Sequence, residues 1–235
     1  MVNLLRYPDA LKFRDQHEIW DDFTDDTVAE HWVKTGDASS TFAVGDAVGG
    51  IMTVTPGSAT DEDECYVESP NETFKIATGK PLVFEALVQF TEAVAGTANV
   101  IAGIMSAVGA DTLVDAGAGP KTTFDGAVIY KVDGGTVWRC RSSVGATNTD
   151  SVSTTTAGGA AYQRLRIEWH DYTATQAQIT FEVGGVRLVD SRGLPIVHTV
   201  LFASATEMQI ALGAKNGGST QESLLVDYVF AGQVR

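Results

Sequence analysis

The carboxylates are the first side chains in this sequence that could do chemistry. Asp61-Glu62-Asp63-Glu64 is an uninterrupted acidic run, and Asp21, Asp22, Asp25 and Asp26 lie close together near the start of the chain. Calcium takes about 6–8 oxygen ligands, and acidic loops can supply them. Successive side chains of an extended segment point to opposite sides, however, and neither stretch has the spacing of an EF-hand loop. We interpret both as solvated loops and predict no metal ion and no cofactor.

A pair of carboxylates that cleaves a glycosidic bond is the second possibility. Such an enzyme needs two acidic residues that flank the bond, and in a sandwich both must face one side of a sheet. Glu85 stands alone in a long apolar segment, and Glu168 has no acidic residue two positions away. Glu62 and Glu64 have that spacing but lie in a loop-like context. We therefore predict that the chain is not an enzyme and assign no catalytic residue.

Histidines and serines indicate no site either. His17, His31, His170 and His198 are far apart and lack the spacing of metal ligands, so we expect them at the surface or in turns. The sequence has no G-x-S-x-G motif of a serine hydrolase. Its glycine-rich stretches lack the lysine and the following serine or threonine of a phosphate-binding loop, which favours turns.

The four tryptophans could form a platform for sugar rings, because aromatic faces pack against other apolar faces. Trp138 and Trp169 lie in strand-like segments with apolar residues two positions away, and we expect them in the core. Trp20 and Trp32 flank the first strand-like region and could instead anchor the N-terminal segment. A sugar-binding site is therefore left open, with no place assigned to it.

The composition excludes several classes of protein. The chain has 235 residues, with 16 Lys and Arg against 30 Asp and Glu, which gives a net charge of −14 at pH 7. So acidic a chain is not expected to bind nucleic acid, because phosphate contacts need clustered basic residues. No apolar run reaches the roughly 20 residues of a membrane span, and the N-terminus lacks the apolar segment of a signal peptide. Cys65 and Cys140 are expected to be reduced core thiols of a protein made in a reducing cytoplasm, with one long-range disulfide between them as the alternative.

Strand-like segments dominate from Ile19 onward, as short alternating or apolar runs separated by glycine-containing turns. The clearest runs are residues 51–55, 81–90, 100–105, 127–132, 136–141, 162–169, 178–183, 186–190, 208–215 and 223–230. Gly134-Gly135 and Gly184-Gly185 each join two runs, which predicts tight hairpins because glycine readily adopts positive φ. Residues 147–156 are expected to form an edge strand or a surface loop. Without amphipathic crossover helices, the pattern predicts an all-β, antiparallel sandwich.

The N-terminal segment differs from the rest, since it carries Arg6, Lys12 and Arg14 ahead of an acidic body. It is either an arm that docks on another molecule or a strap across its own domain, and the sequence does not separate these readings. We divide the chain into an arm, residues 1–18, and one sandwich domain, residues 19–235.

The C-terminal half resembles the concanavalin A-like, laminin G-like jelly-roll domains. Residues 162–169 are similar to a strand of that family with a leading aromatic residue. Residues 181–186 are similar to its hairpin, with Gly184 standing where the family usually has aspartate. The resemblance implies a jelly-roll β-sandwich, here with a short N-terminal arm, and the missing aspartate weakens any expectation of loop-bound calcium.

Other segments resemble proteins encoded among the head genes of tailed bacteriophages, namely residues 79–86, 104–111 and 130–135. The resemblance implies a non-enzymatic virion structural protein that decorates the capsid surface after synthesis in the host cytoplasm. Its partner would be the major capsid protein, and it would be a homo-oligomer on the shell, with no membrane and no nucleic-acid partner. The alternative is a carbohydrate-binding module of a phage tail or capsid fibre that binds a host glycan. The expected capsid contacts are Leu4, Leu5, Arg6, Tyr7, Lys12, Phe13 and Arg14.

Overall fold

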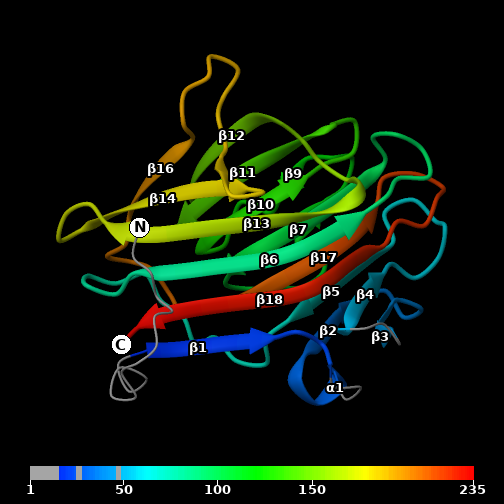
Figure 1. Ribbon diagram of the computed structural model, residues 1–235, viewed down its shortest axis with the longest axis horizontal. Coiled ribbons are helices and arrows are strands. Elements are labelled where there is room, and N and C mark those ends of the chain that lie inside the picture. Colours follow the sequence, from blue (N-terminus) through cyan, green and yellow to red (C-terminus); the bar gives the residue numbers. More distant parts are fainter. Residues whose placement is uncertain (1–15, 25–27, 46–48) are drawn as a thin grey trace.

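The structure is a computed structural model that describes residues 16–24, 28–45 and 49–235 (Figure 1). Within these ranges the chain consists almost entirely of strands and connecting loops, with one short helix, α1 (Val28–His31). Every strand pair is antiparallel. The predicted all-β class is therefore confirmed.

The larger sheet, which we call sheet A, has nine strands in the described part of the chain. Seven lie in the order β15-β14-β13-β6-β18-β4-β3, while β1 pairs with β18 and β16 pairs with β14. The strands are β1 (Gln16–Asp21), β3 (Thr41–Gly45), β4 (Ile51–Thr55), β6 (Leu82–Phe90), β13 (Gly159–Asp171), β14 (Gln176–Val183), β15 (Val186–Arg187), β16 (Val197–Leu201) and β18 (Leu224–Val234). Figure 1 shows β14, β13, β6, β18 and β1 as adjacent bands across the front.

The second sheet, sheet B, has seven strands in the order β12-β11-β10-β7-β17-β5-β2. They are β2 (Val33–Gly36), β5 (Glu64–Glu68), β7 (Ala98–Met105), β10 (Gly126–Lys131), β11 (Val137–Val144), β12 (Thr147–Thr156) and β17 (Gln209–Asn216). A small ribbon joins β8 (Leu113–Val114) to β9 (Gly119–Pro120). The edge position of β12 confirms the prediction for residues 147–156.

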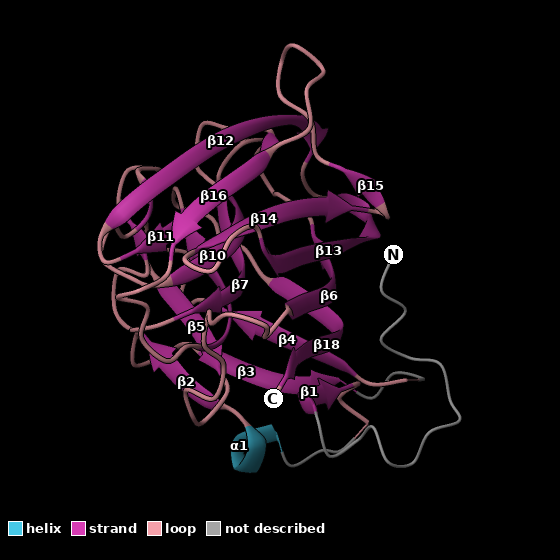
Figure 2. Cartoon of the chain, turned by 90° about the vertical axis from the view of Figure 1, so that its left-hand side faces the viewer, coloured by secondary structure: helices cyan, strands magenta, loops and turns pink. Residues whose placement is uncertain are grey.

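The main core lies between the two layers, which Figure 2 shows with β13, β6 and β18 on one side and β11, β7 and β5 on the other. Alternate side chains of each strand point inward, as the period of two requires. Trp138 and Trp169 are both buried there, as predicted. Trp138 and Phe90 pack edge to face, with their ring centroids 5.7 Å apart. Cys65 and Cys140 are buried free thiols in the same core.

The predicted hairpins are confirmed by their backbone angles. Gly134 has φ 72°, and Gly184 and Gly185 have φ 62° and 81°. These values lie in the left-handed region, where a residue with a Cβ atom is strained.

The N-terminal arm falls mostly outside the described residues. The expected capsid contacts Leu4, Leu5, Arg6, Tyr7, Lys12, Phe13 and Arg14 all lie there. Gln16, His17 and Glu18, the last residues assigned to the arm, belong to β1 and pair with the end of β18. The sheet therefore begins three residues before the predicted boundary.

The outer face of sheet B is covered by residues 106–125, which we call the cover segment. It contains β8 and β9, and its Leu113 and Phe124 are buried in a second apolar cluster with Tyr66, Ile101 and Tyr130. The backbone N–H of Leu113 also donates to the Tyr66 hydroxyl, at 3.0 Å. The central strands of this sheet, β7, β10 and β17, are therefore closed to solvent.

A buried ammonium group fastens the cover segment to sheet B. The Lys215 side chain is 1% exposed, and its Nζ lies 3.1 Å from both Asp111 Oδ1 and the Leu113 carbonyl oxygen and 3.3 Å from Glu64 Oε2. Asp115 and Glu62 complete the surrounding acceptors. Burial alone would lower the pKa of Lys215, but the surrounding carboxylates outweigh it and raise the pKa.

The prediction of a solvated loop for residues 61–64 is therefore wrong for two of its members. Glu64 is buried and binds Lys215, and Glu62 accepts a hydrogen bond from the Ala116 backbone N–H at 2.7 Å. Their partners come from β17 and from the cover segment, which are distant in sequence, so the run alone could not reveal them.

Candidate functional site

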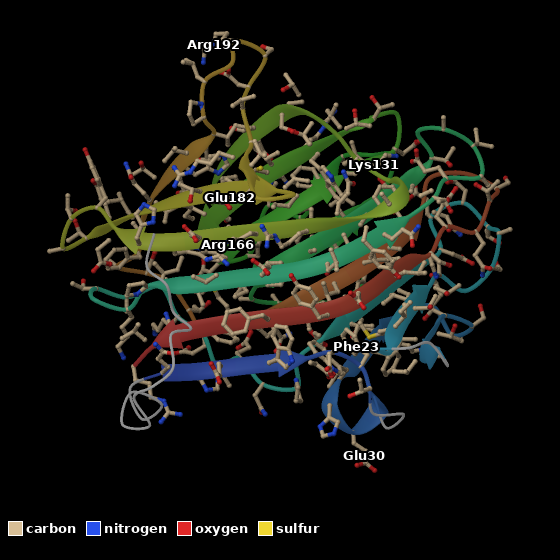
Figure 3. The ribbon with its side chains drawn as sticks, in the orientation of Figure 1. Phe23, Glu30, Lys131, Arg166, Glu182 and Arg192 are labelled. Carbon is tan, nitrogen blue, oxygen red and sulfur yellow. The ribbon has the colours of Figure 1, made fainter. Side chains whose placement is uncertain are left out.

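Among the described residues no segment covers the outer face of sheet A, which carries a row of charged and aromatic side chains. Register pairs connect six neighbouring strands at one level across the sheet. We call these residues the polar row: Trp20 on β1, Phe230 on β18, Glu85 on β6, Arg166 on β13, Glu182 on β14 and Arg187 on β15. Figure 3 labels Arg166 and Glu182, which lie side by side on the neighbouring strands β13 and β14.

The row faces outward because the residues on either side of it face the core. Phe84, Ile167 and Phe181 are fully buried between the sheets. Since successive side chains of a strand alternate, the charged residue next to each of them must point away from the core. Rigid strands therefore hold each polar group in place.

Three aromatic rings gather at one end of the row, and we call them the aromatic platform. Trp20 is 57% exposed and stacks on Tyr228, with ring centroids 5.1 Å apart and an interplanar angle of 21°. Phe230 lies against Trp20 at 6.2 Å. A Cβ atom at Gly232 would lie 2.7 Å from the Phe230 ring, so this glycine gives the ring its space. A large apolar surface is thus left in contact with water.

Beside the platform, one guanidinium group joins two carboxylates. Arg166 donates from Nη1 to Glu85 Oε2 at 2.9 Å, and from Nε and Nη2 to Glu168 Oε1 at 2.8 and 2.6 Å. The Tyr228 hydroxyl donates to Glu85 Oε1 at 2.6 Å. Partial burial, together with the Glu85 hydrogen bond and charge, raises the pKa of Tyr228, so the phenol stays protonated and can donate.

The sequence offers no suitable pair of carboxylates within one strand, but the structure brings two together from different strands. Glu85 and Glu168 come from different strands, β6 and β13, and meet through the guanidinium of Arg166. Their pairing depends on strand register across a long sequence separation, which the sequence does not display. The available signal was chemical: a charged residue inside an otherwise apolar strand marks its outward face.

The other predicted site residues are placed as follows. The sequence leaves the roles of Trp20 and Trp32 undecided. Trp20 is exposed, whereas Trp32 is buried and donates from Nε1 to Asp21 Oδ2 at 2.7 Å. His198 is 1% exposed, so its predicted surface position is wrong. In the described ranges no group of three or more His, Cys, Asp or Glu residues is arranged to hold a metal ion.

His198 instead joins the two sheets at their common edge. Its Nδ1 lies 2.9 Å from the hydroxyl oxygen of Ser142 on β11, and its Nε2 lies 3.0 Å from that of Ser151 on β12. The ring also packs against Phe181, with centroids 4.9 Å apart. Burial lowers the pKa of His198 to about 4, so the ring is neutral at pH 7.

No helix in the part of the chain that the structure describes is long and apolar enough to cross a membrane.

No family model matches the sequence, and no curated protein matches it. Solved structures do match the fold. An endo-1,3-β-glucanase from Streptomyces sioyaensis has a TM-score of 0.59 and 14% identity, covering 98% of this chain and 99% of the enzyme. The Emp47p carbohydrate recognition domain has a TM-score of 0.60 and 10% identity, covering 96% and 98%. An endo-β-1,4-glucuronan lyase from Trichoderma reesei has a TM-score of 0.58 and 10% identity, covering 85% and 90%.

These matches show that the chain has the lectin-like jelly-roll sandwich that its C-terminal half resembles. They also correct one prediction. Two of the three structures are enzymes, a glucanase and a lyase, so the expectation that this chain is not an enzyme is contradicted. That expectation treated the sandwich as a passive scaffold, although this fold also carries active sites.

Proposed function

We propose that the protein binds an oligosaccharide on the outer face of sheet A. The observation that carries this proposal is the exposed Trp20 ring, stacked on Tyr228 directly beside the Glu85–Arg166–Glu168 network. A saccharide presents apolar C–H faces and hydroxyl edges, and this surface offers an aromatic face and ionised hydrogen-bonding groups side by side.

The open face suits a chain-like ligand. The polar row crosses six strands, and neighbouring strands lie about 4.8 Å apart, so groups that can contact a ligand repeat over roughly 24 Å. A sugar ring packed on the aromatic platform would place its neighbours over Glu85 and Glu168. These carboxylates accept hydrogen bonds from sugar hydroxyls, and the Arg166 contacts keep them oriented.

The fold neighbours support this choice of ligand. The three similar structures are a glucanase, a glucuronan lyase and a carbohydrate recognition domain. Each of those proteins is named for a carbohydrate, and their shared fold is the fold of this chain.

The test is a glycan array followed by calorimetry with the best ligand. We expect a bound oligosaccharide whose affinity falls at least tenfold in Trp20→Ala. A nucleobase stacked on an aromatic side chain contributes about 1–3 kcal/mol, and we expect a sugar ring packed on the exposed Trp20 to contribute a similar amount. Tyr172→Ala is the matched control, since Tyr172 is 59% exposed but lies in the turn after β13. Absence of any ligand, or equal losses in both variants, would show that the proposal is wrong.

Cleavage of the bound glycan is the second candidate function, favoured by the carboxylate pair. Glu85 and Glu168 lie within reach of one guanidinium, and glycosidases act through two carboxyl groups that flank the scissile bond. We expect new reducing ends from β-linked glucans, lost in Glu85→Gln and in Glu168→Gln. If the wild-type protein binds glycan but releases no reducing ends, cleavage is excluded for those substrates and binding is not.

The virion location implied by the resemblance to phage head proteins stays a prediction. The same holds for capsid attachment through the arm and for assembly as a homo-oligomer. The test is deletion of residues 1–15, which stops before β1 because Gln16 pairs with Val234. We expect the shortened chain to stay folded and to lose binding to capsids; unchanged capsid binding would contradict a role for the arm.

A further inference from the structure

Arg164 lies on the same outer face as the polar row, two residues before Arg166 on β13. Leu87 of β6 pairs with Arg164 on one side and with Tyr228 on the other. These three residues form a second row beside the first. Two strand spacings of about 4.8 Å place the backbones of Arg164 and Tyr228 roughly 10 Å apart.

In the described part of the chain the guanidinium of Arg164 has no acidic partner, unlike its neighbours on this face. Arg166 is bound by two carboxylates, and Arg187 lies 3.8 Å from Glu182. Arg164 is exposed, and its guanidinium takes part in no hydrogen bond or ion pair within the described residues, although its backbone carbonyl accepts from the Gly184 N–H at 2.8 Å. It is therefore a free positive charge on a chain of net charge −14.

The surroundings of Arg164 position the guanidinium without neutralising it. A Cβ atom at Gly185 would lie 2.7 Å from Arg164 Nη2, so the guanidinium rests against the hairpin between β14 and β15. Its charge also acts on Tyr228, where it opposes the rise in the pKa of the phenol. Asp227 is the carboxylate on β18 nearest in sequence to Tyr228, and it forms no ion pair with Arg164 among the described residues.

We propose that Arg164 pairs with a carboxylate of the bound saccharide, so that the site selects acidic sugars such as uronic acids over their neutral counterparts. This inference rests on the proposed function. The planar guanidinium presents two parallel N–H donors, which match the two oxygens of a carboxylate. Glu85, Glu168 and Glu182 are already paired to other arginines, and Arg164 is the arginine of this face that has no carboxylate partner among the described residues.

The test uses matched pairs of oligosaccharides, uronic-acid oligomers and the same oligomers with each carboxyl group reduced to an alcohol. An array of β-1,3-, β-1,4- and α-1,4-linked pairs identifies the best pair, and calorimetry measures it. We expect the wild-type protein to bind the acidic member at least tenfold more tightly at low salt, and the preference to shrink in high salt. Arg164→Gln should abolish the preference and leave the affinity for the neutral member unchanged.

Arg192→Gln is the matched control, because Arg192 is an exposed arginine on the loop that protrudes beyond β14 and is paired with Asp190 (Figure 3). Equal wild-type affinity for both members, or equal weakening of both in Arg164→Gln, would overturn the role of Arg164 and leave carbohydrate binding intact. Failure of every array member to bind would overturn the proposed function and this inference together.

Discussion

The outer face of each sheet carries a basic side chain surrounded by carboxylates, which is partly exposed on sheet A and buried on sheet B. On sheet A, Arg166 lies between two carboxylates, and its side chain is 24% exposed. On sheet B, Lys215 lies among four carboxylates and is 1% exposed, because the cover segment closes over it. The buried Lys215 ammonium group holds the cover segment on sheet B. The Arg166 network is partly exposed to water, so its charged groups can also contact a ligand.

The apolar residues on the two outer faces differ in the same way, buried on sheet B and exposed on sheet A. Tyr66, Ile101 and Tyr130 on sheet B are buried beneath the cover segment. On sheet A, Trp20 stays exposed although burial of its ring would contribute to stability. A contiguous apolar patch rimmed by polar residues is typical of a surface that contacts another molecule, and the platform of Trp20, Tyr228 and Phe230 beside the charged network has this arrangement. The outer face of sheet B therefore holds the cover segment, whereas the outer face of sheet A is the one that we propose binds a ligand.

The largest expected effect is the loss of the buried cation in Lys215→Met. The buried Glu64 carboxylate would lose its ammonium partner, as would the more exposed Glu62, Asp111 and Asp115, and breaking a buried pair costs about 3–5 kcal/mol. Urea unfolding measures this free energy. The control is Lys75→Met, because the Lys75–Glu207 pair is exposed and should contribute less than about 1 kcal/mol. Equal effects in the two variants would contradict the fastening role of Lys215.

The next largest expected effect is the pH dependence of stability that comes from His198, at the edge where the two sheets meet. Its pKa is lowered by burial to about 4, against 6.5 in the unfolded chain. Above pH 6.5 neither state binds the proton. As the pH falls from 6.5 to 4, the unfolded chain binds it first, so the free energy of unfolding should decrease by about 3 kcal/mol.

Urea unfolding of the wild type and of His198→Gln between pH 7.5 and 4 isolates this contribution. The variant is less stable at pH 7.5, because the two serine contacts change, but its stability should depend less steeply on pH. Parallel pH profiles in the two proteins would rule out His198 as the source.

Much of this architecture could be predicted from the sequence, because it depends on local patterns. Strand alternation placed Trp138 and Trp169 in the core, and Gly184 marked its hairpin through positive φ. The site could not be located in this way. The meeting of Glu85 with Arg166 depends on the register of β6 against β13, which many distant contacts determine together.

The burial of Lys215 and His198 could not be predicted from the sequence for the same reason. Each polar group is buried only because partners from distant segments satisfy it, and an unpartnered group of either type belongs at the surface. Trp20 shows the converse, since its exposure follows from the pairing of β1 with β18 at the other end of the chain.

Arg166→Met tests the open counterpart of the Lys215 cluster. The Arg166 network is partly solvated, so we expect a loss of about 1–2 kcal/mol, smaller than for Lys215→Met. Salt screens exposed charges more than buried ones. The loss should therefore shrink in 1 M NaCl for Arg166→Met and persist for Lys215→Met. The same response of both variants to salt would remove the distinction between the two faces.

The smallest effect on stability is expected for Trp20→Ala. One face of the ring packs on Tyr228, but the side chain is 57% exposed, so its removal should cost about 1 kcal/mol or less. Trp138→Ala, which empties a buried core position, should cost about 3–5 kcal/mol. Urea unfolding of both variants provides the measurement. A loss in Trp20→Ala as large as in Trp138→Ala would mean that Trp20 supports the fold, and its exposure would then no longer indicate a binding surface.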